Sequence, residues 1–377
     1  MGTKDTVPLD LSRLRVFPLS GRRSLTRCED ILLDPDSPAP DLPASMLEQI
    51  TGAAAAIAAA RRRDASVILI YGAHLLRNGA ALILDALMAG GWITHVATNG
   101  AGTIHDWEYA WLGRSTEGVE ANVAAGTFGC WEETGSTIHL ALAAGAVEGL
   151  GWGRALGRFI QEDGVTLPSP AALESLISAA PAAPGAGALV DLLGWMQRAG
   201  LNEGRFDMQH GWKHASILAS AWRHGVAASV HPGIGYDIIA NHPGFNGAVL
   251  GRGADLDFRL FGGSVAQLEG GVVLSVGSAI MGPQVFEKSL SCVNNLRIQD
   301  GLGPLSGHSI FVVDLQDGGD WDWTRGEPPK DNPAYYLRFC KSFSRMGAPM
   351  HYLQCDNAAF IHHLWRALPQ TGRPSAS

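Results

Sequence analysis

The segment Asn99–Asp106 (NGAGTIHD) combines a glycine-rich turn with a histidine and a carboxylate. Glycines at such a turn let the backbone approach a diphosphate, and the amides that begin a following helix favour an anion. The segment lacks the GxGxxG spacing, so an ordinary tight turn explains it equally well. His105 and Asp106 could form an acid/base pair, because histidine titrates near neutral pH. A surface or helix-cap role is the more common use of such a pair.

Three other groups of residues could take part in binding or catalysis. Glu132 and Glu133 could anchor a cationic substrate or simply begin a helix. Trp321 and Trp323 lie in a glycine-rich loop and are expected to cover something, either a site or a subunit contact. The neighbouring side chains in His362–His363 diverge on a helix, and the sequence has no HxxxH, HExxH or CxxC motif. We therefore predict no metal site.

Short apolar runs predict the elements that position these residues. Residues 66–71, 93–97, 227–230, 271–276, 310–315 and 352–355 are expected as strands, and residues 46–63, 82–89 and 257–268 as helices. Continuous apolar runs are typical of buried parallel strands, and strand–helix–strand spacing indicates βαβ units. The sequence thus predicts an α/β fold with a doubly wound, mostly parallel, Rossmann-like sheet, and a ligand site where strand carboxyl ends converge.

Composition limits the function classes. The chain has 377 residues, a net charge of −8 and 17% charged residues, and it shows no basic stripe for nucleic acid. The five cysteines are scattered, and no early apolar run resembles a signal peptide or membrane span, so we expect a cytoplasmic protein with no membrane partner. The low charge also favours an oligomer. We expect an N-terminal arm over residues 1–45, a single domain over 46–368 with a Pro/Ala-rich excursion at 164–190 containing one short helix, and a flexible tail over 369–377.

Several segments, taken in order, resemble the deoxyhypusine synthases. The resemblance rests on residues 71–79 (YGAHLLRNG), 94–106 (THVATNGAGTIHD), 231–239 (HPGIGYDII), 257–278, 310–317, 330–338 (KDNPAYYLR) and 352–364. They cover about a fifth of the chain, and their shared order is a stronger sign than any single match.

The resemblance implies a homotetramer that binds NAD on a deoxyhypusine synthase-type fold, with active sites between subunits. It implies that Asp237 binds the amine end of a substrate and that Asp356 binds an adenosine-ribose hydroxyl. The cofactor-binding residues implied are Gly72, Asn99, Gly100, Gly102, Asp106, Gly277, Ser278, Gln316 and Asp356.

The sequence departs from this family at the catalytic stretch. The family's imine-forming lysine falls on Arg338, which cannot lose its proton at useful pH. A glutamate falls on Asn332, an indole falls on Tyr336, and a histidine is lost near Gly282-Pro283. Lys341 is the one serious substitute for the missing lysine, since it lies three residues after Arg338.

These observations predict an NAD-dependent transferase or oxidoreductase that transiently oxidises a C–N or C–OH centre of a small polar molecule without a lysine imine. His105 or His231 is expected as the base, Asp237 as the residue that holds a cation or hydroxyl, and Arg338 as the residue that binds an anionic group. Two alternatives remain open: a polyamine aminobutyl transferase of the homospermidine or deoxyhypusine synthase type, and a non-catalytic NAD-binding regulatory protein.

Overall fold

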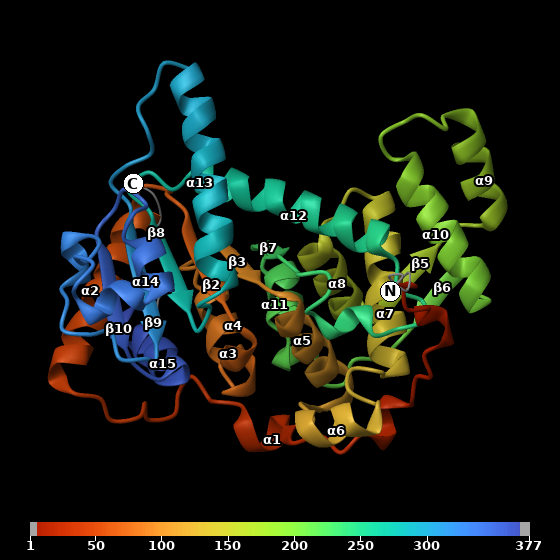
Figure 1. The fold of residues 1–377 in the computed structure, drawn as a ribbon, viewed down its shortest axis with the longest axis horizontal. Helices are drawn as coiled ribbons and strands as arrows, with labels where there is room; N and C mark the ends of the chain where they lie inside the picture. The colour runs from red at the N-terminus through yellow and green to blue at the C-terminus, as the bar shows by residue number, and fades with distance from the viewer. Residues whose placement is uncertain (1–5, 370–377) are drawn as a thin grey trace, which may run out of the picture.

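A computed structural model describes residues 6–369, so most of the predicted tail lies outside the described residues. Six parallel strands form one sheet in the order β10-β9-β8-β2-β3-β7 (Figure 1). The strands are β2 (Val67–Tyr71), β3 (His95–Thr98), β7 (Ala227–Val230), β8 (Val272–Val276), β9 (Ser309–Asp314) and β10 (Met350–Gln354). The predicted α/β class with a parallel sheet is therefore confirmed.

The strand order is that of a doubly wound dinucleotide-binding sheet. Numbered along the chain, the six strands run 3-2-1-4-5-6 from β7 to β10. The direction of winding reverses between β2 and β8, which are hydrogen-bonded neighbours from Val67 to Tyr71. In open α/β sheets, ligands bind outside the strand carboxyl ends at this switch point.

Helices cover both faces of the sheet, and β2 shows why its apolar run is continuous. Val67, Leu69 and Tyr71 face one hydrophobic cluster, whereas Ile68 and Ile70 face the other. The helices that contribute buried residues to the first cluster include α2 (Ala44–Arg62), α4 (Ala81–Ala89), α5 (Gly100–Leu112), α7 (Glu132–Val147), α8 (Trp152–Gln161), α11 (Ile217–Arg223) and α15 (Asn357–Ala367). Phe261 and Val265 of α12 (Gly247–Ala266), together with α13 (Met281–Gln299) and α14 (Arg338–Phe343), contribute to the second.

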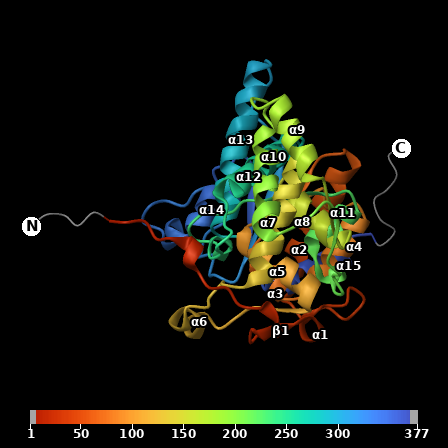
Figure 2. The ribbon, with the colours of Figure 1, turned by 90° about the vertical axis from the view of Figure 1, so that its right-hand side faces the viewer.

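The N-terminal arm is hydrogen-bonded to the body through short elements. β1 (Thr26–Arg27) pairs antiparallel with β4 (Arg114–Ser115), and α1 (Cys28–Ile31) follows directly. Figure 2 shows the arm, in red, along the lower edge of the molecule near α6 (Val119–Ala125). The Glu133 carboxylate accepts a hydrogen bond of 2.7 Å from the Leu19 amide. The arm is thus the observed partner of this carboxylate.

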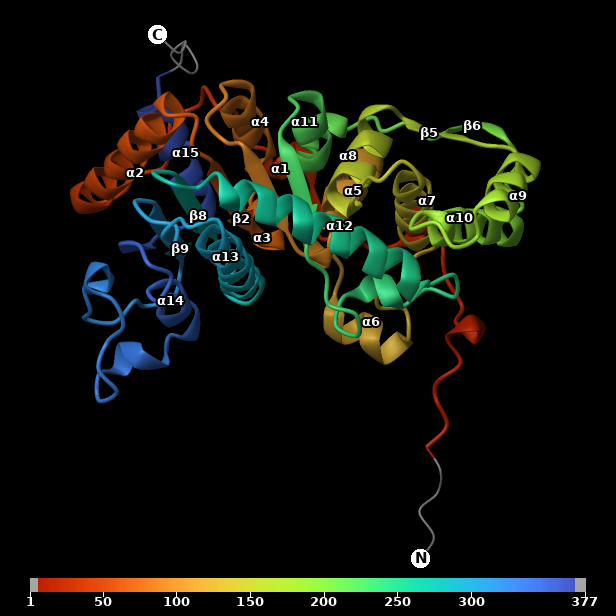
Figure 3. The ribbon, with the colours of Figure 1, turned by 90° about the horizontal axis from the view of Figure 1, so that it is seen from above.

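Two expectations about secondary structure are wrong in extent. The helix expected at 257–268 is α12, which begins ten residues earlier because the Asn246 side chain caps it by accepting from the amides of Ala248 and Val249. The excursion at 164–190 was expected to hold one short helix. It contains β5 (Gly164–Leu167), which pairs with β6 (Gly204–Asp207), as well as α9 (Pro170–Ala179) and the start of α10 (Ala186–Ala199). Figure 3 shows α9 and α10 at the end of the molecule opposite β9.

The tryptophan loop covers the protein's own core. Trp323 is 3% exposed, belongs to the second hydrophobic cluster and donates a 3.0 Å hydrogen bond to the Gly318 carbonyl. Trp321 donates a 2.8 Å bond to the Gly326 carbonyl. Of the two roles expected, a lid and a subunit contact, neither is needed to explain the burial of Trp323.

Candidate functional site

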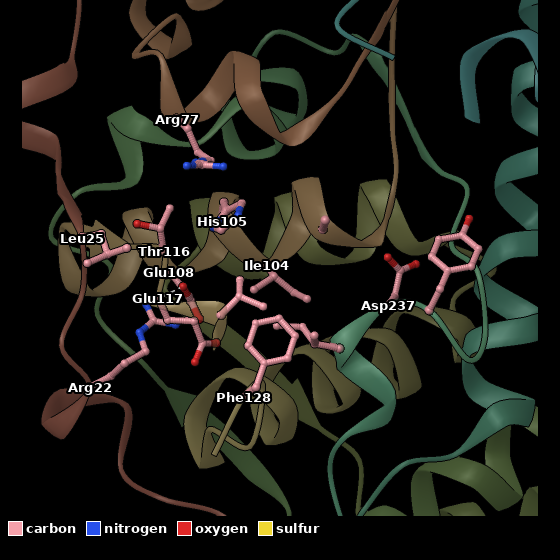
Figure 4. A pocket seen from close by; sticks show the side chains of 14 residues that line it. Arg22, Leu25, Arg77, Ile104, His105, Glu108, Thr116, Glu117, Phe128 and Asp237 are labelled. Carbon is pink, nitrogen blue, oxygen red and sulfur yellow. Dashed lines mark hydrogen bonds and ion pairs between the residues drawn. The ribbon is translucent and has the colours of Figure 1, made fainter. Parts of the chain in front are cut away.

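A cavity of about 330 Å³ lies beside the first three turns of α5 (Figure 4). This volume falls in the lower part of the range found for small-molecule sites. Its walls come from segments far apart in the sequence: the arm, the end of α3 (Ala73–Arg77), α5, the α6 segment and the loop after β7. The polar side chains that line it are Arg22, Arg77, His105, Glu108, Thr116, Glu117, Tyr236 and Asp237.

A hydrogen-bonded chain fixes the tautomer of His105. Glu108 and Arg22 form a buried bidentate ion pair with two contacts of 2.7 Å. The Ser115 hydroxyl donates to the Glu108 carboxylate, so its oxygen accepts from His105 Nδ1 at 2.7 Å. His105 therefore carries its proton on Nδ1, which leaves a lone pair on Nε2.

The electrostatics keep His105 neutral. Burial lowers the pKa of His105 to about 4; Glu108 opposes this shift, while Arg77, Arg22 and His74 reinforce it. At neutral pH the ring is a neutral imidazole that can accept a proton or a hydrogen bond at Nε2. Of the two expected bases, His105 is thus the one that lines the cavity.

Asp237 occupies the amino end of α5. Its carboxylate accepts a 2.7 Å hydrogen bond from the Gly233 amide and further bonds from the amides of Gly100 and Ala101. A Cβ on residue 100 would collide with this carboxylate, which explains the glycine. Burial raises the pKa of Asp237, and the three amide bonds oppose that rise. Asp237 faces the cavity in Figure 4.

The glycine turn before α5 is engaged by the protein itself. Asn99 caps α5 by accepting a 2.9 Å hydrogen bond from the Gly102 amide. Gly102 packs against Thr98, where a Cβ would clash. Two of the first amides of α5 already contact Asp237. The expected contact between this turn and a diphosphate therefore stays a prediction, since a diphosphate would have to displace a carboxylate.

Asp106 lies away from the cavity. Its side chain is fully buried and accepts hydrogen bonds from Ser216 Oγ and from the Ile217 amide at 2.7 Å, so it caps α11. Burial raises the pKa of Asp106 to about 7, and the bonds from α11 oppose that rise. An NAD contact for this residue remains untested, and its hydrogen bonds give it a structural role.

His231 belongs to a second hydrogen-bonded chain. Its Nε2 lies 3.0 Å from Ser229 Oγ, which is 2.8 Å from Nε2 of the buried His95. His95 Nδ1 in turn lies 2.8 Å from Ser264 Oγ on α12. Burial lowers the pKa of His231 to about 4 and that of His95 to about 3. This chain leads into the core between β3, β7 and α12.

The other predicted cofactor residues meet at the switch point of the sheet. Gly72 caps α3, and a Cβ there would collide with the Gly277 carbonyl directly after β8. Gly277 has a φ of +60° and packs against Asn357, whose Oδ1 is buried without a hydrogen-bond partner. Ser278 Oγ accepts from the Gly282 amide at 3.1 Å, which shapes the start of α13.

Asp356 and Gln316 follow the neighbouring strands β10 and β9. One Asp356 oxygen caps α15 by accepting from the Ala358 and Ala359 amides at 3.0 and 2.9 Å. The residue is exposed, so the other oxygen is accessible. Gln316 is exposed, and its carbonyl accepts from the Tyr352 hydroxyl. Carboxylates after such strands are suited to ribose hydroxyls.

The predicted catalytic stretch lies apart from the cavity. Tyr336 is 76% exposed, Arg338 is exposed, and Asn332 caps the following turn by accepting from the Ala334 amide at 2.8 Å. Lys341 Nζ lies 3.7 Å above the Tyr335 ring. Figures 1 and 3 place α14 on the other side of α13 from α5 and α6. One chain therefore does not bring these residues to His105.

Sequence reasoning missed three side chains that line the cavity, Arg22, Arg77 and Glu108, as well as Ser115, which holds His105 from behind. Arg22 and Glu108 are 86 residues apart, and nothing in the sequence pairs them. Arg77 lies inside a segment that resembles a cofactor-binding turn, which was the available signal. Glu132 lies 3.6 Å from His242 and Glu133 binds the arm, so the structure gives both expected substrate anchors other contacts.

Within residues 6–369, no group of three or more potential ligands is arranged for a metal ion. His362 is buried, and His363 Nε2 lies 2.6 Å from the Pro40 carbonyl. Across the same range, no helix combines the length and apolarity that a membrane crossing requires.

No protein-family model matches the sequence, and no curated protein matches it. Solved structures with similarity include the arginine dihydrolase ArgZ from the ornithine-ammonia cycle in cyanobacteria, at 12% identity and a TM-score of 0.39 over 86% of this chain and 33% of that one. AgrE in complex with ornithine and NAD⁺ is 11% identical, with a TM-score of 0.42 over 87% and 34%. A LOR/SDH protein from Methanococcus maripaludis S2 is 12% identical, with a TM-score of 0.41 over 94% and 76%. The chain thus spans about a third of the length of ArgZ and AgrE.

Proposed function

We propose that this chain is an NAD-dependent enzyme that transiently oxidises a C–N or C–OH centre of a small polar metabolite, as a deoxyhypusine synthase-like protein without a lysine imine. The observation that carries the proposal is the strand order 3-2-1-4-5-6, together with a cavity that holds a neutral histidine and that one short helix connects to the switch point. The helix α3 links the two features, because it begins at Gly72 in the switch point and ends at Arg77 in the cavity.

The residues at the switch point fit a dinucleotide. Gly72 and Gly277 allow the loops after β2 and β8 to pack closely, because a Cβ at Gly72 would collide with the Gly277 carbonyl and a Cβ at Gly277 would collide with Asn357. The unpartnered amide oxygen of Asn357 is a buried acceptor in the same place. Asp356 is suited to a ribose hydroxyl, and Gln316 and Ser278 lie on neighbouring loops. When bound, NAD supplies an acceptor for a hydride that can later be returned.

The chain's own residues supply the proton chemistry. His105 accepts a proton from a substrate hydroxyl or amine at Nε2, while Ser115 and Glu108 hold its ring and tautomer. Arg22 holds Glu108 in position through the bidentate pair. Asp237 receives a hydroxyl or ammonium group at the far side of the cavity. Arg338 cannot form an imine and is assigned to an anionic group.

The same residues fit two alternatives less well. Aminobutyl transfer would need either direct attack by a free amine or an imine on Lys341, whose ammonium group contacts the Tyr335 ring. Borohydride trapping with candidate amines and NAD, read by intact mass, should give no adduct. A trapped adduct on Lys341 would restore the transferase proposal. A regulatory protein would bind NAD without producing NADH.

Exposed apolar side chains support an oligomer with sites at subunit boundaries. Ile280, Leu315 and Tyr336 lie in loops at the carboxyl side of the sheet and are 72%, 66% and 76% exposed. Large apolar groups at a ligand-binding edge are often covered by a partner. Light scattering should therefore show a dimer or tetramer at micromolar concentration, and a monomer would contradict this part of the proposal.

Calorimetry with NAD and absorbance of NADH test the proposed function together. Wild-type protein should bind NAD and produce an NADH signal with its substrate. His105→Gln should bind NAD with unchanged affinity but lose the signal, because glutamine cannot accept the proton. Ser115→Ala should lose part of the NADH signal and shift the pH profile of the reaction, since the His105 ring loses its orienting partner. Absence of NAD binding by the wild-type protein would reject the proposal.

A further inference from the structure

Among residues 6–369, Arg77 is a cation without an ion-pair partner, and it lies at the wall of the cavity. Its side chain points toward His105 in Figure 4. Its Nε is buried and makes no hydrogen bond, and none of the ion pairs within residues 6–369 includes it. A buried donor that lacks an acceptor costs free energy unless a ligand supplies one.

The carboxylates nearest to Arg77 are already engaged. Glu108 accepts from both terminal nitrogens of Arg22 and from Thr134 Oγ1 at 3.0 Å. Glu117 accepts from Trp131 Nε1 at 3.0 Å and from the Gly129 amide at 3.2 Å. Figure 4 shows Asp237 at the opposite side of His105 from Arg22 and Glu108. The positive charge of Arg77 is therefore available to a ligand.

His105 also responds to this charge. The groups that face its ring are Glu108 on the same helix, Arg77 and His74 on α3, and Arg22 on the arm. An anion bound at Arg77 would cancel part of the positive potential at His105. Ligand binding would thus make His105 easier to protonate, which is the direction that a base requires.

We propose that Arg77 binds the carboxylate of a small organic acid, placing a hydroxyl or amine of the same molecule against His105. Guanidinium groups pair with carboxylates through two parallel hydrogen bonds, which fixes the orientation of the ligand. A second polar end would reach Asp237, so an amino acid or hydroxy acid fits the cavity better than a polyamine. This inference rests on the proposed function for its chemistry and assigns the substrate class of the same cavity.

The test compares the binding of simple probes to the full chain. Butyrate, 4-aminobutyrate and butylamine differ only in their charged ends, and NAD is titrated separately. Arg77→Gln removes the charge, Arg77→Lys retains it, and Arg259→Gln is the matched control at an exposed arginine on α12. Arg77→Gln should weaken the binding of butyrate and of 4-aminobutyrate by about tenfold or more, the effect of a lost charge-assisted hydrogen bond. Arg77→Lys should recover part of this loss, and Arg259→Gln should bind both acids as wild type does.

A second readout does not depend on affinity alone. An NMR titration of His105 in the presence of saturating butyrate should show its pKa raised relative to the free protein, and Arg77→Gln should abolish this ligand-dependent shift. Unchanged butyrate binding in Arg77→Gln, or tighter binding of butylamine than of butyrate, would overturn the inference. Loss of NAD affinity alone in Arg77→Gln would also overturn it, because the anion would then be the dinucleotide's phosphate. Arg77-dependent butyrate binding by a protein that does not bind NAD would leave the inference standing and reject the proposed function.

Discussion

The two ends of the sheet present their polar residues in opposite ways. In the cavity region, which we define as β3 and β7 with α3, α5 and the arm, the residues that orient His105 are buried and joined by hydrogen bonds. His105, Ser115 and Glu108 form one such chain. In the α14 region, comprising β9, β10 and α14, the predicted site residues Tyr336 and Arg338 are exposed.

This difference separates a preorganised site from an incomplete one. Groups held by neutralised charges and fixed tautomers need little rearrangement when a ligand arrives. Exposed groups gain chemical function only when a ligand or a second chain covers them. The cavity region is therefore the better place to seek chemistry within one chain, whereas the role proposed for Arg338 depends on association.

The largest difference between the regions should appear in acid. Burial lowers the pKa values of several histidines to about 3 or 4, so each is neutral in the folded protein. His308 belongs to the other side of the molecule. The other five belong to the cavity region or to the segments packed on it: His95, His105, His139, His210 and His231. Because the unfolded chain binds these protons more readily, stability should fall as the pH drops from about 6.5 toward 4.

Two carboxyl groups act in the opposite direction. Burial raises the pKa of Asp106 to about 7 and that of Asp257 to about 8, so their contributions are greatest in acid and are lost as the pH rises through these values. The histidines outnumber them, and the net result should be a lower free energy of unfolding in mild acid. Urea titrations monitored by circular dichroism between pH 4.5 and 8 would measure this dependence. Equal stability at pH 7 and 4.5 would contradict it.

The next effect compares one ion pair from each region. Arg22→Ala leaves the buried Glu108 carboxylate without its main partner and should lower the free energy of unfolding by about 3–5 kcal/mol. Arg345→Ala removes the Arg345–Glu327 pair, whose side chains are 54% and 30% exposed, and should cost about 0–1 kcal/mol. Urea unfolding of both variants measures the contrast. Similar losses would mean that the Arg22–Glu108 pair is not a special feature of the cavity region.

A smaller effect concerns the cofactor edge of the α14 region. Asp356→Ala removes both a helix cap and the proposed ribose ligand, whereas Asp356→Ser retains a capping oxygen. Asp356→Ser should keep nearly wild-type stability but weaken NAD binding by about 1–3 kcal/mol, the range for a lost hydrogen bond to a charged group. Calorimetry and thermal melting separate the two roles. Unchanged NAD affinity in Asp356→Ser would remove this residue from the site.

The smallest effect is expected at the exposed predicted site. Tyr336→Ala and Arg338→Ala should each change the free energy of unfolding by no more than about 0.5 kcal/mol, because neither side chain makes a buried contact in one chain. Measurement above and below the concentration at which the protein associates provides the control. A larger loss that appears only at high concentration would place these residues in a subunit interface.

Sequence by itself determined the local elements that carry the fold. The continuous apolar run at 67–71 requires burial on both faces, and this is sufficient to predict a central parallel strand. The glycine turn at Asn99 was also readable, since an Asn cap and small residues begin a helix after β3. His105, Asp237 and the two glycines at the switch point were all identified as residues of interest from the sequence.

Tertiary structure alone decided what those residues contact. Asp237 lies more than one hundred residues from Gly100, yet its carboxylate occupies the turn that the sequence suggested for a diphosphate. Arg22 and Ser115 orient His105 only because the arm crosses α5, and Arg77 becomes an unpaired charge only because Glu108 and Glu117 are engaged elsewhere. Hydrogen bonds and desolvation depend on neighbours brought together by the whole fold. Local periodicity contains no record of them.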